Sequence, residues 1–278
     1  MILRLAALLG LALSGCQGST GGSSLPPLAC EAGSWPSAGT TGVPAGTPAL
    51  TVLGSDLHTS VDGQVFDAVE LRGRLYVDHA GVTIRRSRLI GDEYYAVYAT
   101  AGGHGLTIED SEILGGVRIP DGFTGRRNHL HAPAGGTRDD GWFVSASHVL
   151  LEDNLIDGLV GGDGAHLDGI QVAGGQDITV RHNRVEAVSP PISGGGVNAA
   201  IFFAADLGAI SDVTVDCNLL IEQDGYYPLR IYDARGAVVV RRNRWVRGFL
   251  GAPVHVEDTG LAAWEDNAYE DGEAIPAP

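Results

Sequence analysis

This chain of 278 residues repeats one phrase, whose clearest copy reads Ile178-Thr-Val-Arg-His-Asn183-Arg-Val. An alternating β-branched stretch comes first, a charged pair follows it, and Asn183 then leads into a second apolar alternation. Alternation with a period of two predicts β-strands. Asn suits a sharp bend without Gly or Pro, because it tolerates the left-handed conformation and its side chain can bond to neighbouring backbone. The phrase therefore predicts two strands joined at a corner.

Copies of the phrase recur along the chain at irregular intervals. The central residue of each copy is Ser87, Ser111, Asn128, Asn154, Asn183, Asn218, Asn243 or Asn267. Successive copies are 17 to 35 residues apart, and repeats of this length indicate a solenoid whose coils stack on one another. Strands in neighbouring coils lie about 4.8 Å apart, so the Asn side chains can hydrogen-bond along the stack. A leucine-rich repeat would need regular Leu spacing and near-constant length, which this chain lacks.

A strand, an Asn corner and a second strand in every coil resemble the right-handed parallel β-helices of the pectate lyase and polygalacturonase superfamily. The resemblance covers about residues 65–269. It implies an all-β fold, a single-stranded right-handed parallel β-helix of about eight coils with an asparagine ladder. We place this β-helix at residues 49–278.

The first residues have the pattern of an export signal. Arg4 precedes an apolar run from Leu5 to Leu13, which is shorter than the roughly 20 residues of a membrane-spanning helix. The small residues before Cys16 resemble the lipobox of bacterial lipoproteins. This resemblance implies a signal peptide at residues 1–15, lipidation of Cys16 and a place in the cell envelope, at the outer membrane or the cell surface. An ordinary secretory signal is the alternative.

Residues 16–48 are rich in Gly, Ser, Thr and Pro, a composition that predicts a flexible tether. Cys30 lies in this tether and Cys217 lies in the body. An exported chain reaches a compartment that permits disulfides, so the sequence leaves a bridge between these two residues and a pair of thiols equally open. Three cysteines are too few for a zinc site built on Cys ligands.

The charge balance limits what the protein can bind. Asp and Glu number 34 against 18 basic residues, all of them Arg, and the net charge is -16. This balance argues against nucleic acid as a partner, and the absence of Lys excludes Schiff-base and P-loop chemistry. We expect a monomer that contacts a membrane only through its lipid.

A third strand follows a variable loop in each coil. The longest of these loops span residues 132–140, 158–167, 189–198 and 224–228. Insertions in a solenoid gather on the face that binds a ligand. In the families that the chain resembles, the substrate cleft runs along this same sheet. We therefore expect a polysaccharide substrate to bind there.

The densest polar cluster lies in two of these loops. The first segment reads Thr137-Arg138-Asp139-Asp140-Gly141, and the second reads Gly162-Asp163-Gly-Ala-His166-Leu-Asp168-Gly-Ile-Gln171. In our register Asp140 and Asp168 take equivalent positions in adjacent coils and face outward. Two carboxylates about 5 Å apart raise the pKa of one of them unless a cation lies between.

The first chemical interpretation is a calcium site formed by Asp139, Asp140, Asp163 and Asp168, since carboxylate oxygens are the ligands that Ca²⁺ prefers. This arrangement resembles the strategy of pectate lyases, in which the ion binds a uronate carboxylate and a base removes the C5 proton in a β-elimination. His166 and Arg230 are the candidate bases. His166 suits the role better, because the intrinsic pKa of Arg lies above about 12.

The second interpretation is hydrolysis, with Asp140 and Asp168 divided into a proton donor and a base. The segment from His166 to Gln171 looks like a degenerate form of the polygalacturonase motif Asn-Thr-Asp-Gly-Xaa-Asp. Gln171 stands where the motif has its last Asp, and the Gly-His-Gly segment at residues 103–105 lies in the wrong coil. Elimination is therefore the leading hypothesis.

The third interpretation is a glycan-binding or structural β-helix without catalysis. The Asp-Gly steps would then only form turns at strand entry. We expect contacts to the glycan from the following residues: Arg138, Gln171, Trp142, Tyr226, Tyr227 and Tyr232.

Overall fold

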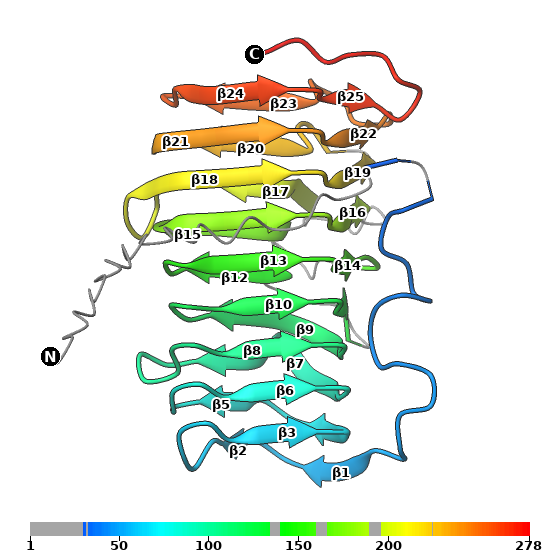
Figure 1. Ribbon diagram of the computed structural model, residues 1–278, viewed down its shortest axis with the longest axis vertical. Coiled ribbons are helices and arrows are strands. Elements are labelled where there is room, and N and C mark those ends of the chain that lie inside the picture. Colours follow the sequence, from blue (N-terminus) through cyan, green and yellow to red (C-terminus); the bar gives the residue numbers. More distant parts are fainter. Residues whose placement is uncertain (1–29, 32, 134–139, 160–165, 189–195, 224) are drawn as a thin grey trace, which may run out of the picture.

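The computed structural model describes residues 30, 31, 33–133, 140–159, 166–188, 196–223 and 225–278. These residues form 25 β-strands, and the ladders between strands are parallel (Figure 1). The coils stack into one elongated solenoid with three faces. The expected all-β parallel β-helix is confirmed. Among the described residues there is no helix that could cross a membrane.

Each coil contributes a strand to each face. Face 1, which precedes the Ser/Asn corner, consists of β3 (Val65–Asp67), β6 (Thr83–Arg85), β8 (Thr107–Glu109), β10 (Thr124–Arg126), β13 (Val149–Glu152), the end of β15 (His166–Arg181), β18 (Ile210–Asp216), β21 (Ala234–Arg241) and β24 (Leu261–Glu265). Face 2, which follows the corner, consists of β1 (Thr51–Gly54), β4 (Val69–Arg72), the start of β7 (Arg88–Ala99), the start of β9 (Glu112–Ile119), β11 (His129–His131), β14 (Leu155–Ile156), β16 (Arg184–Val188), β19 (Leu219–Gln223), β22 (Arg244–Val246) and β25 (Ala268–Tyr269). Face 3 consists of β2 (Leu57–His58), β5 (Leu75–Val77), the ends of β7 and β9, β12 (Trp142–Ser145), the start of β15, β17 (Gly196–Phe203), β20 (Leu229–Tyr232) and β23 (Val254–Glu257).

The corner between faces 1 and 2 carries the asparagine ladder that the sequence predicts. Its members are Asn128, Asn154, Asn183, Asn218, Asn243 and Asn267, all buried. Each Nδ2 donates to the Oδ1 of the next member, over 3.1, 2.9, 3.0, 3.0 and 3.1 Å in turn. The hydroxyl of Ser111 continues the ladder, since it accepts the backbone N–H of Ser87 over 3.1 Å.

The left-handed residue of the corner differs from the one that we expected. It is the residue before each ladder position, with φ between 49° and 58° at Arg86, Asp110, Arg127, Asp153, His182, Cys217, Arg242 and Asp266. The Asn itself is not left-handed, because its amide is aligned with the stack and bonds along it. This backbone conformation is unfavourable for residues other than Gly, and the buried ladder compensates for it.

The outer surface of face 1 carries a column of strictly alternating charges. In the order of the coils it reads Asp67, Arg85, Glu109, Arg126, Glu152, Arg181, Asp216, Arg241 and Glu265. Pairs such as Arg126 with Glu152, at 2.8 Å, join neighbouring coils. Alternation keeps like charges from stacking on adjacent strands. The Arg residues of this column therefore form ion pairs within the protein.

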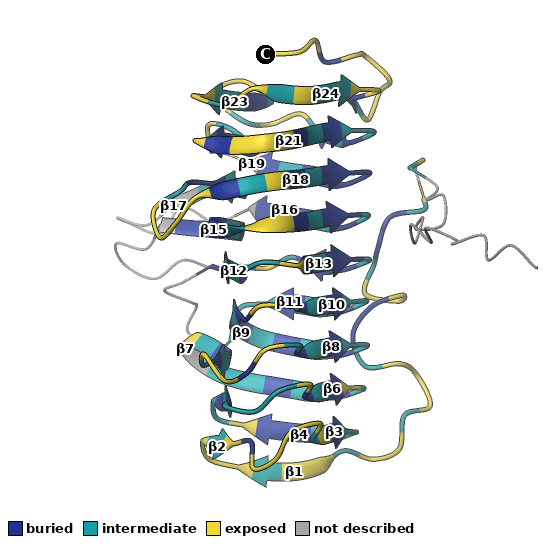
Figure 2. Cartoon of the chain, turned by 60° about the vertical axis from the view of Figure 1, so that its left-hand side comes forward, coloured by how far each residue is buried: buried dark blue, intermediate teal, exposed yellow. Residues whose placement is uncertain are grey.

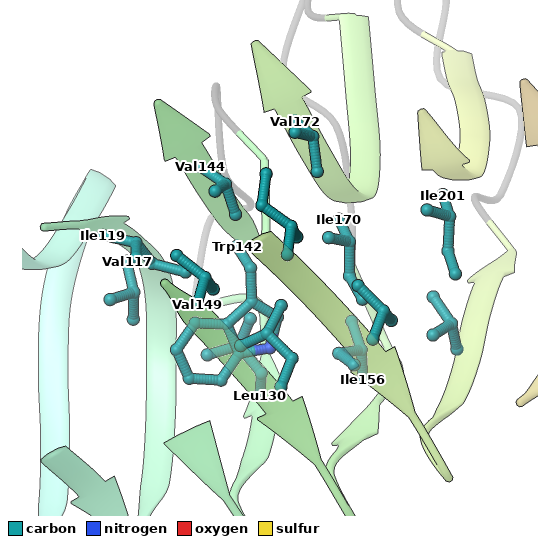
Figure 3. Packing of buried hydrophobic residues seen from close by; sticks show 14 of the residues in the cluster. Val117, Ile119, Leu130, Trp142, Val144, Val149, Ile156, Ile170, Val172 and Ile201 are labelled. Carbon is teal, nitrogen blue, oxygen red and sulfur yellow. The ribbon is translucent and has the colours of Figure 1, made fainter. Parts of the chain in front are cut away.

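Buried residues recur in coil after coil of the stack (Figure 2). The apolar ones among them form one core, from Phe66 to Ile275. Strand β12 alternates buried and half-buried residues, with Trp142 and Val144 inside. The centre of the Trp142 ring lies 5.5 Å from that of the Phe123 ring. Figure 3 shows Trp142 in the core beside Leu130 and Val149. Trp142 is completely buried, so the prediction that it contacts substrate is wrong.

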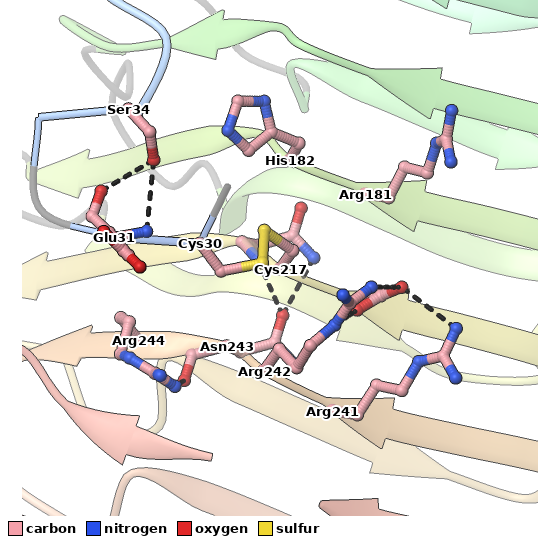
Figure 4. The surroundings of a disulfide bond; sticks show 12 residues. Cys30, Glu31, Ser34, Arg181, His182, Cys217, Arg241, Arg242, Asn243 and Arg244 are labelled. Carbon is pink, nitrogen blue, oxygen red and sulfur yellow. Dashed lines mark hydrogen bonds and ion pairs between the residues drawn. A yellow bond between two sulfur atoms is a disulfide. The ribbon is translucent and has the colours of Figure 1, made fainter. Parts of the chain in front are cut away.

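The N-terminal segment crosses the outside of the β-helix and is attached to it. Cys30 and Cys217 form a disulfide, which settles the alternative that the sequence left open (Figure 4). Trp35 is buried against Cys217 and Leu219, and the backbone N–H of Gly42 donates to the carbonyl of Arg127 over 2.9 Å. Residues 33–48, the second half of the predicted tether, therefore lie along the β-helix (Figure 1).

Candidate functional site

One column of side chains runs along the outside of face 3. In the order of the coils it reads His58, Tyr76, Tyr98, Arg118, Phe143, Gln171, Phe202, Arg230 and His255. All nine are at least partly exposed. We call this set the face-3 column. It contains four Tyr or Phe rings, two His, two Arg and one Gln, and no carboxylate.

The rings and the cations of the face-3 column touch one another. The guanidinium of Arg118 lies 5.0 Å from the ring centre of Tyr98 and 5.8 Å from that of Phe143. The guanidinium of Arg230 lies 4.7 Å from the ring centre of Phe202. Neither Arg forms an ion pair with a carboxylate of the described residues, in contrast to the Arg residues of face 1. Stacking on rings orients both cations while leaving them available to an anion.

At the C-terminal end of the column, further aromatic side chains cluster around Arg230 and His255. Tyr232 accepts a hydrogen bond from Nη2 of Arg230 over 2.7 Å, and its ring lies 5.3 Å from that of His255. The Tyr227 ring lies 4.7 Å from the His255 ring, and Tyr226 is 63% exposed. The predicted contacts Tyr226, Tyr227 and Tyr232 are thus brought together here. Gln171 lies on the column itself.

Asp140 and Asp168 take equivalent positions in adjacent coils, as the register predicts. Trp142 pairs with Ile170, and two residues earlier the backbone N–H of Asp168 donates to Oδ1 of Asp140 over 2.8 Å. Both residues are only 2% exposed, so the expectation that they face outward is wrong. Asp140 lies two residues before the buried Trp142, and Asp168 lies two residues before the buried Ile170. The alternation of the strands therefore turns both toward the interior.

Burial controls the protonation of Asp168. It raises the pKa of this residue to about 7, against the opposing effects of a hydrogen bond from Asn198 and the charge of Arg230. Nδ2 of Asn198 lies 3.4 Å from Oδ2 of Asp168, and Oδ1 of Asn198 accepts a hydrogen bond from Arg230. Asn198 therefore connects the buried acid to the guanidinium on the face-3 column.

A second buried acid, Glu222, escaped the sequence analysis. It is completely buried on β19, and neither of its carboxyl oxygens has a partner among the described residues. Burial and the charge of Asp168 raise its pKa to about 8, with Arg230 opposing. Its position two residues after the core residue Leu220 is the signal that could have revealed it, because alternation predicts an inward side chain there.

Several predicted residues cannot be placed in full. Arg138, Asp139 and Asp163 lie outside the described residues, and so does the side chain of His166, whose backbone pairs with Gly196 in β15 and β17. The described part of the chain contains no group of three or more His, Cys, Asp or Glu arranged to hold a metal. Calcium prefers six to eight oxygen ligands, so Asp140 and Asp168 would need further ligands.

Comparisons of the chain with protein-family models, with curated proteins and with solved structures found no match.

Proposed function

We propose that this protein binds an extended acidic glycan along face 3 and cleaves it as a polysaccharide lyase. The face-3 column supports this function most strongly. Its nine positions span roughly 38 Å at the spacing of stacked strands, which suits a polymer better than a small molecule. Flat rings complement the apolar faces of pyranoses, and a half-exposed row of them along one face is typical of a binding surface.

The two cations of the column favour an acidic glycan. A protein with a net charge of -16 repels polyanions in general. A polyanion therefore needs local positive charge on the surface that binds it. Arg118 and Arg230 provide it, because neither is neutralised by an ion pair with a described carboxylate. A guanidinium binds a uronate carboxylate through two parallel hydrogen bonds.

The reaction that we propose is β-elimination near Arg230. A base removes the C5 proton of a uronate, the electron pair forms the C4–C5 double bond, and the C4–O bond breaks with protonation of the leaving oxygen. Arg230 would bind the carboxylate on which negative charge develops. His166 is the proposed base, because its backbone belongs to the coil next to that of Phe202. Asp168 would act as a positioning residue, through Asn198.

Hydrolysis is the second candidate reaction. A buried carboxyl that is protonated near neutral pH is the usual proton donor in glycoside hydrolysis, and Asp168 and Glu222 both have raised pKa values. Their burial counts against this role, since neither is open to a glycan on the surface of face 3. Binding without cleavage is the third candidate and needs only the column.

Calcium, the lipid anchor and the monomeric state stay predictions. Removal of calcium with a chelator should abolish cleavage, and added Ca²⁺ should restore it. A chain that retains full activity in chelator would exclude the metal. Labelling with a radioactive fatty acid, compared between the natural chain and Cys16→Ser, tests whether the protein is held in the cell envelope by its lipid.

The central experiment exposes the natural chain to polygalacturonate, hyaluronan and a neutral glucan, and measures binding, ultraviolet absorbance and reducing ends. Binding of the acidic polymers together with a rise in absorbance from unsaturated ends supports the proposal. Reducing ends without that rise favour hydrolysis, and binding without either product favours a binding protein. Failure to bind any acidic glycan would overturn the proposal altogether.

Variants locate the binding surface. Arg118→Gln should weaken binding of the acidic polymers by about tenfold, the effect of losing one charge-assisted contact. Arg72→Gln is the matched control, because it removes the same charge from face 2, where the Arg72 side chain is 65% exposed. Equal losses in both variants would mean that only net charge matters.

A further inference from the structure

The middle of the face-3 column alternates between two kinds of side chain. From Tyr98 to Arg230 it reads ring, cation, ring, amide, ring, cation, at the positions Tyr98, Arg118, Phe143, Gln171, Phe202 and Arg230. Rings therefore recur every second coil, roughly 9.6 Å apart. The residues between them carry hydrogen-bond donors.

The two kinds of position offer different environments. Phe143 and Phe202 present an apolar surface that would desolvate a carboxylate without replacing its hydrogen bonds, which is unfavourable. Arg118 and Arg230 present guanidinium donors, and Gln171 presents an amide that both donates and accepts. A homopolymer of uronates would place a carboxylate over the rings as well as over the cations. A polymer that alternates acidic and neutral sugars avoids this mismatch.

We propose that the glycan bound on face 3 has a repeat of two sugars, in which a uronate alternates with a neutral or acylated sugar. This inference rests on the proposed function and specifies its substrate class. One pyranose of an extended glycan advances by about the spacing of one coil. A chain along the stack therefore places its neutral sugars over Tyr98, Phe143 and Phe202, and its uronates beside Arg118, Gln171 and Arg230.

A small hollow beside Arg118 fits this register. It has a volume of about 290 Å³, and its lining includes Thr100, His104, Arg118 and Ser145. The hollow has room for a substituent on the sugar next to the guanidinium, such as an acyl group or an extra hydroxymethyl group. Its hydroxyl and imidazole groups can hydrogen-bond to such a substituent.

Calorimetric titration with two hexasaccharides tests the proposal. One is a hexasaccharide of hyaluronan, in which uronates alternate with N-acetylated sugars, and the other is hexagalacturonate, in which every sugar is a uronate. We expect the alternating probe to bind at least about tenfold more tightly. It carries half the carboxylates, so charge alone would give the opposite order.

The outcomes separate the two proposals. If hexagalacturonate binds as tightly as the alternating probe or more tightly, the two-sugar repeat is wrong while acidic-glycan binding stands. If neither probe binds at up to millimolar concentration, the proposed function itself fails.

A pair of variants tests the ring positions directly. Phe143→Leu keeps an apolar side chain and removes the flat ring, and should weaken the alternating probe about fivefold to tenfold and hexagalacturonate by a smaller factor. Phe143→Tyr retains the ring and should bind both probes as the natural chain does. An equal loss for both probes in Phe143→Leu, or no loss for either, would overturn the assignment. Circular dichroism confirms that each variant is folded.

Discussion

Asn183 lies in the middle of the asparagine ladder, and its replacement by Ala tests what holds the corner together. Its Oδ1 accepts hydrogen bonds from the backbone N–H and the Nδ2 of Asn154, over 3.0 and 2.9 Å. Its Nδ2 donates to the carbonyls of Leu151 and Arg181 and to Oδ1 of Asn218, over 2.9, 3.0 and 3.0 Å. Asn183→Ala removes all five interactions at a position that is completely buried.

The expected cost follows from these contacts. A hydrogen bond contributes about 1 kcal/mol net, and a buried polar group left without a partner costs about 1–3 kcal/mol. Two ladder neighbours, Asn154 and Asn218, would each lose a partner in a place that water cannot reach. We expect Asn183→Ala to lower the free energy of unfolding by about 5 kcal/mol, which is large for one substitution.

Asn183→Ser is the matched control, because the chain already uses Ser at two ladder positions. The hydroxyl of Ser111 accepts the N–H of Ser87, and it donates to the carbonyl of Glu109 over 2.8 Å. A Ser at position 183 can likewise accept from Asn154 and donate to Arg181. It loses only the Nδ2 contacts to Leu151 and Asn218, so we expect a cost of about 2 kcal/mol.

Urea unfolding followed by circular dichroism measures both variants. For a chain of this size the free energy of unfolding falls by about 2–3 kcal/mol per molar urea, so the midpoint should fall by about 2 M for Asn183→Ala and by less than about 1 M for Asn183→Ser. Equal midpoints for the two variants would refute the reasoning. A shift of only a few tenths molar in Asn183→Ala would show that the ladder contributes little.

Three further predictions concern charge and the disulfide. Burial raises the pKa of Glu222 to about 8, so the folded chain keeps a proton that the unfolded chain releases near pH 4.5, and stability falls as pH rises between these two values. Glu222→Gln should remove a part of this fall on the order of 5 kcal/mol, in urea midpoints measured from pH 5 to 9. A pH profile that Glu222→Gln leaves unchanged would contradict the prediction. Arg126→Glu should place three carboxylates in a row, at Glu109, position 126 and buried Glu152, and lower the urea midpoint much more than Arg126→Gln. Equal midpoints for the two variants would mean that the charge column is unimportant. Cys30→Ser should release the N-terminal segment from the β-helix, shift the fluorescence of Trp35 to longer wavelength and make residues 33–48 sensitive to proteolysis. If the segment stays protected from proteolysis in this variant, its packing alone holds it to the β-helix.

Local pattern predicted the fold but misplaced the acids of the candidate site. The alternation around Trp142 and Val144 was available in the sequence, and it implies that Asp140 points inward with them. Asp-Gly steps and flanking loops suggested an outward turn, but the strand period determined the direction. Glu222 could have been found by the same rule, since it follows Leu220 by two residues.

The repeated phrase was sufficient to predict the solenoid, its corner and the ladder, because each copy is short and its alternation is local, and the copies recur 17 to 35 residues apart along the chain. The face-3 column, the approach of Glu222 to Asp168 and the link from Cys30 to Cys217 depend instead on which coil lies beside which. The loops between coils vary in length, and their conformations decide how the third strands align. Alignment across coils is set by packing and hydrogen bonding between segments distant in the chain, so only the tertiary structure could bring those side chains into one row.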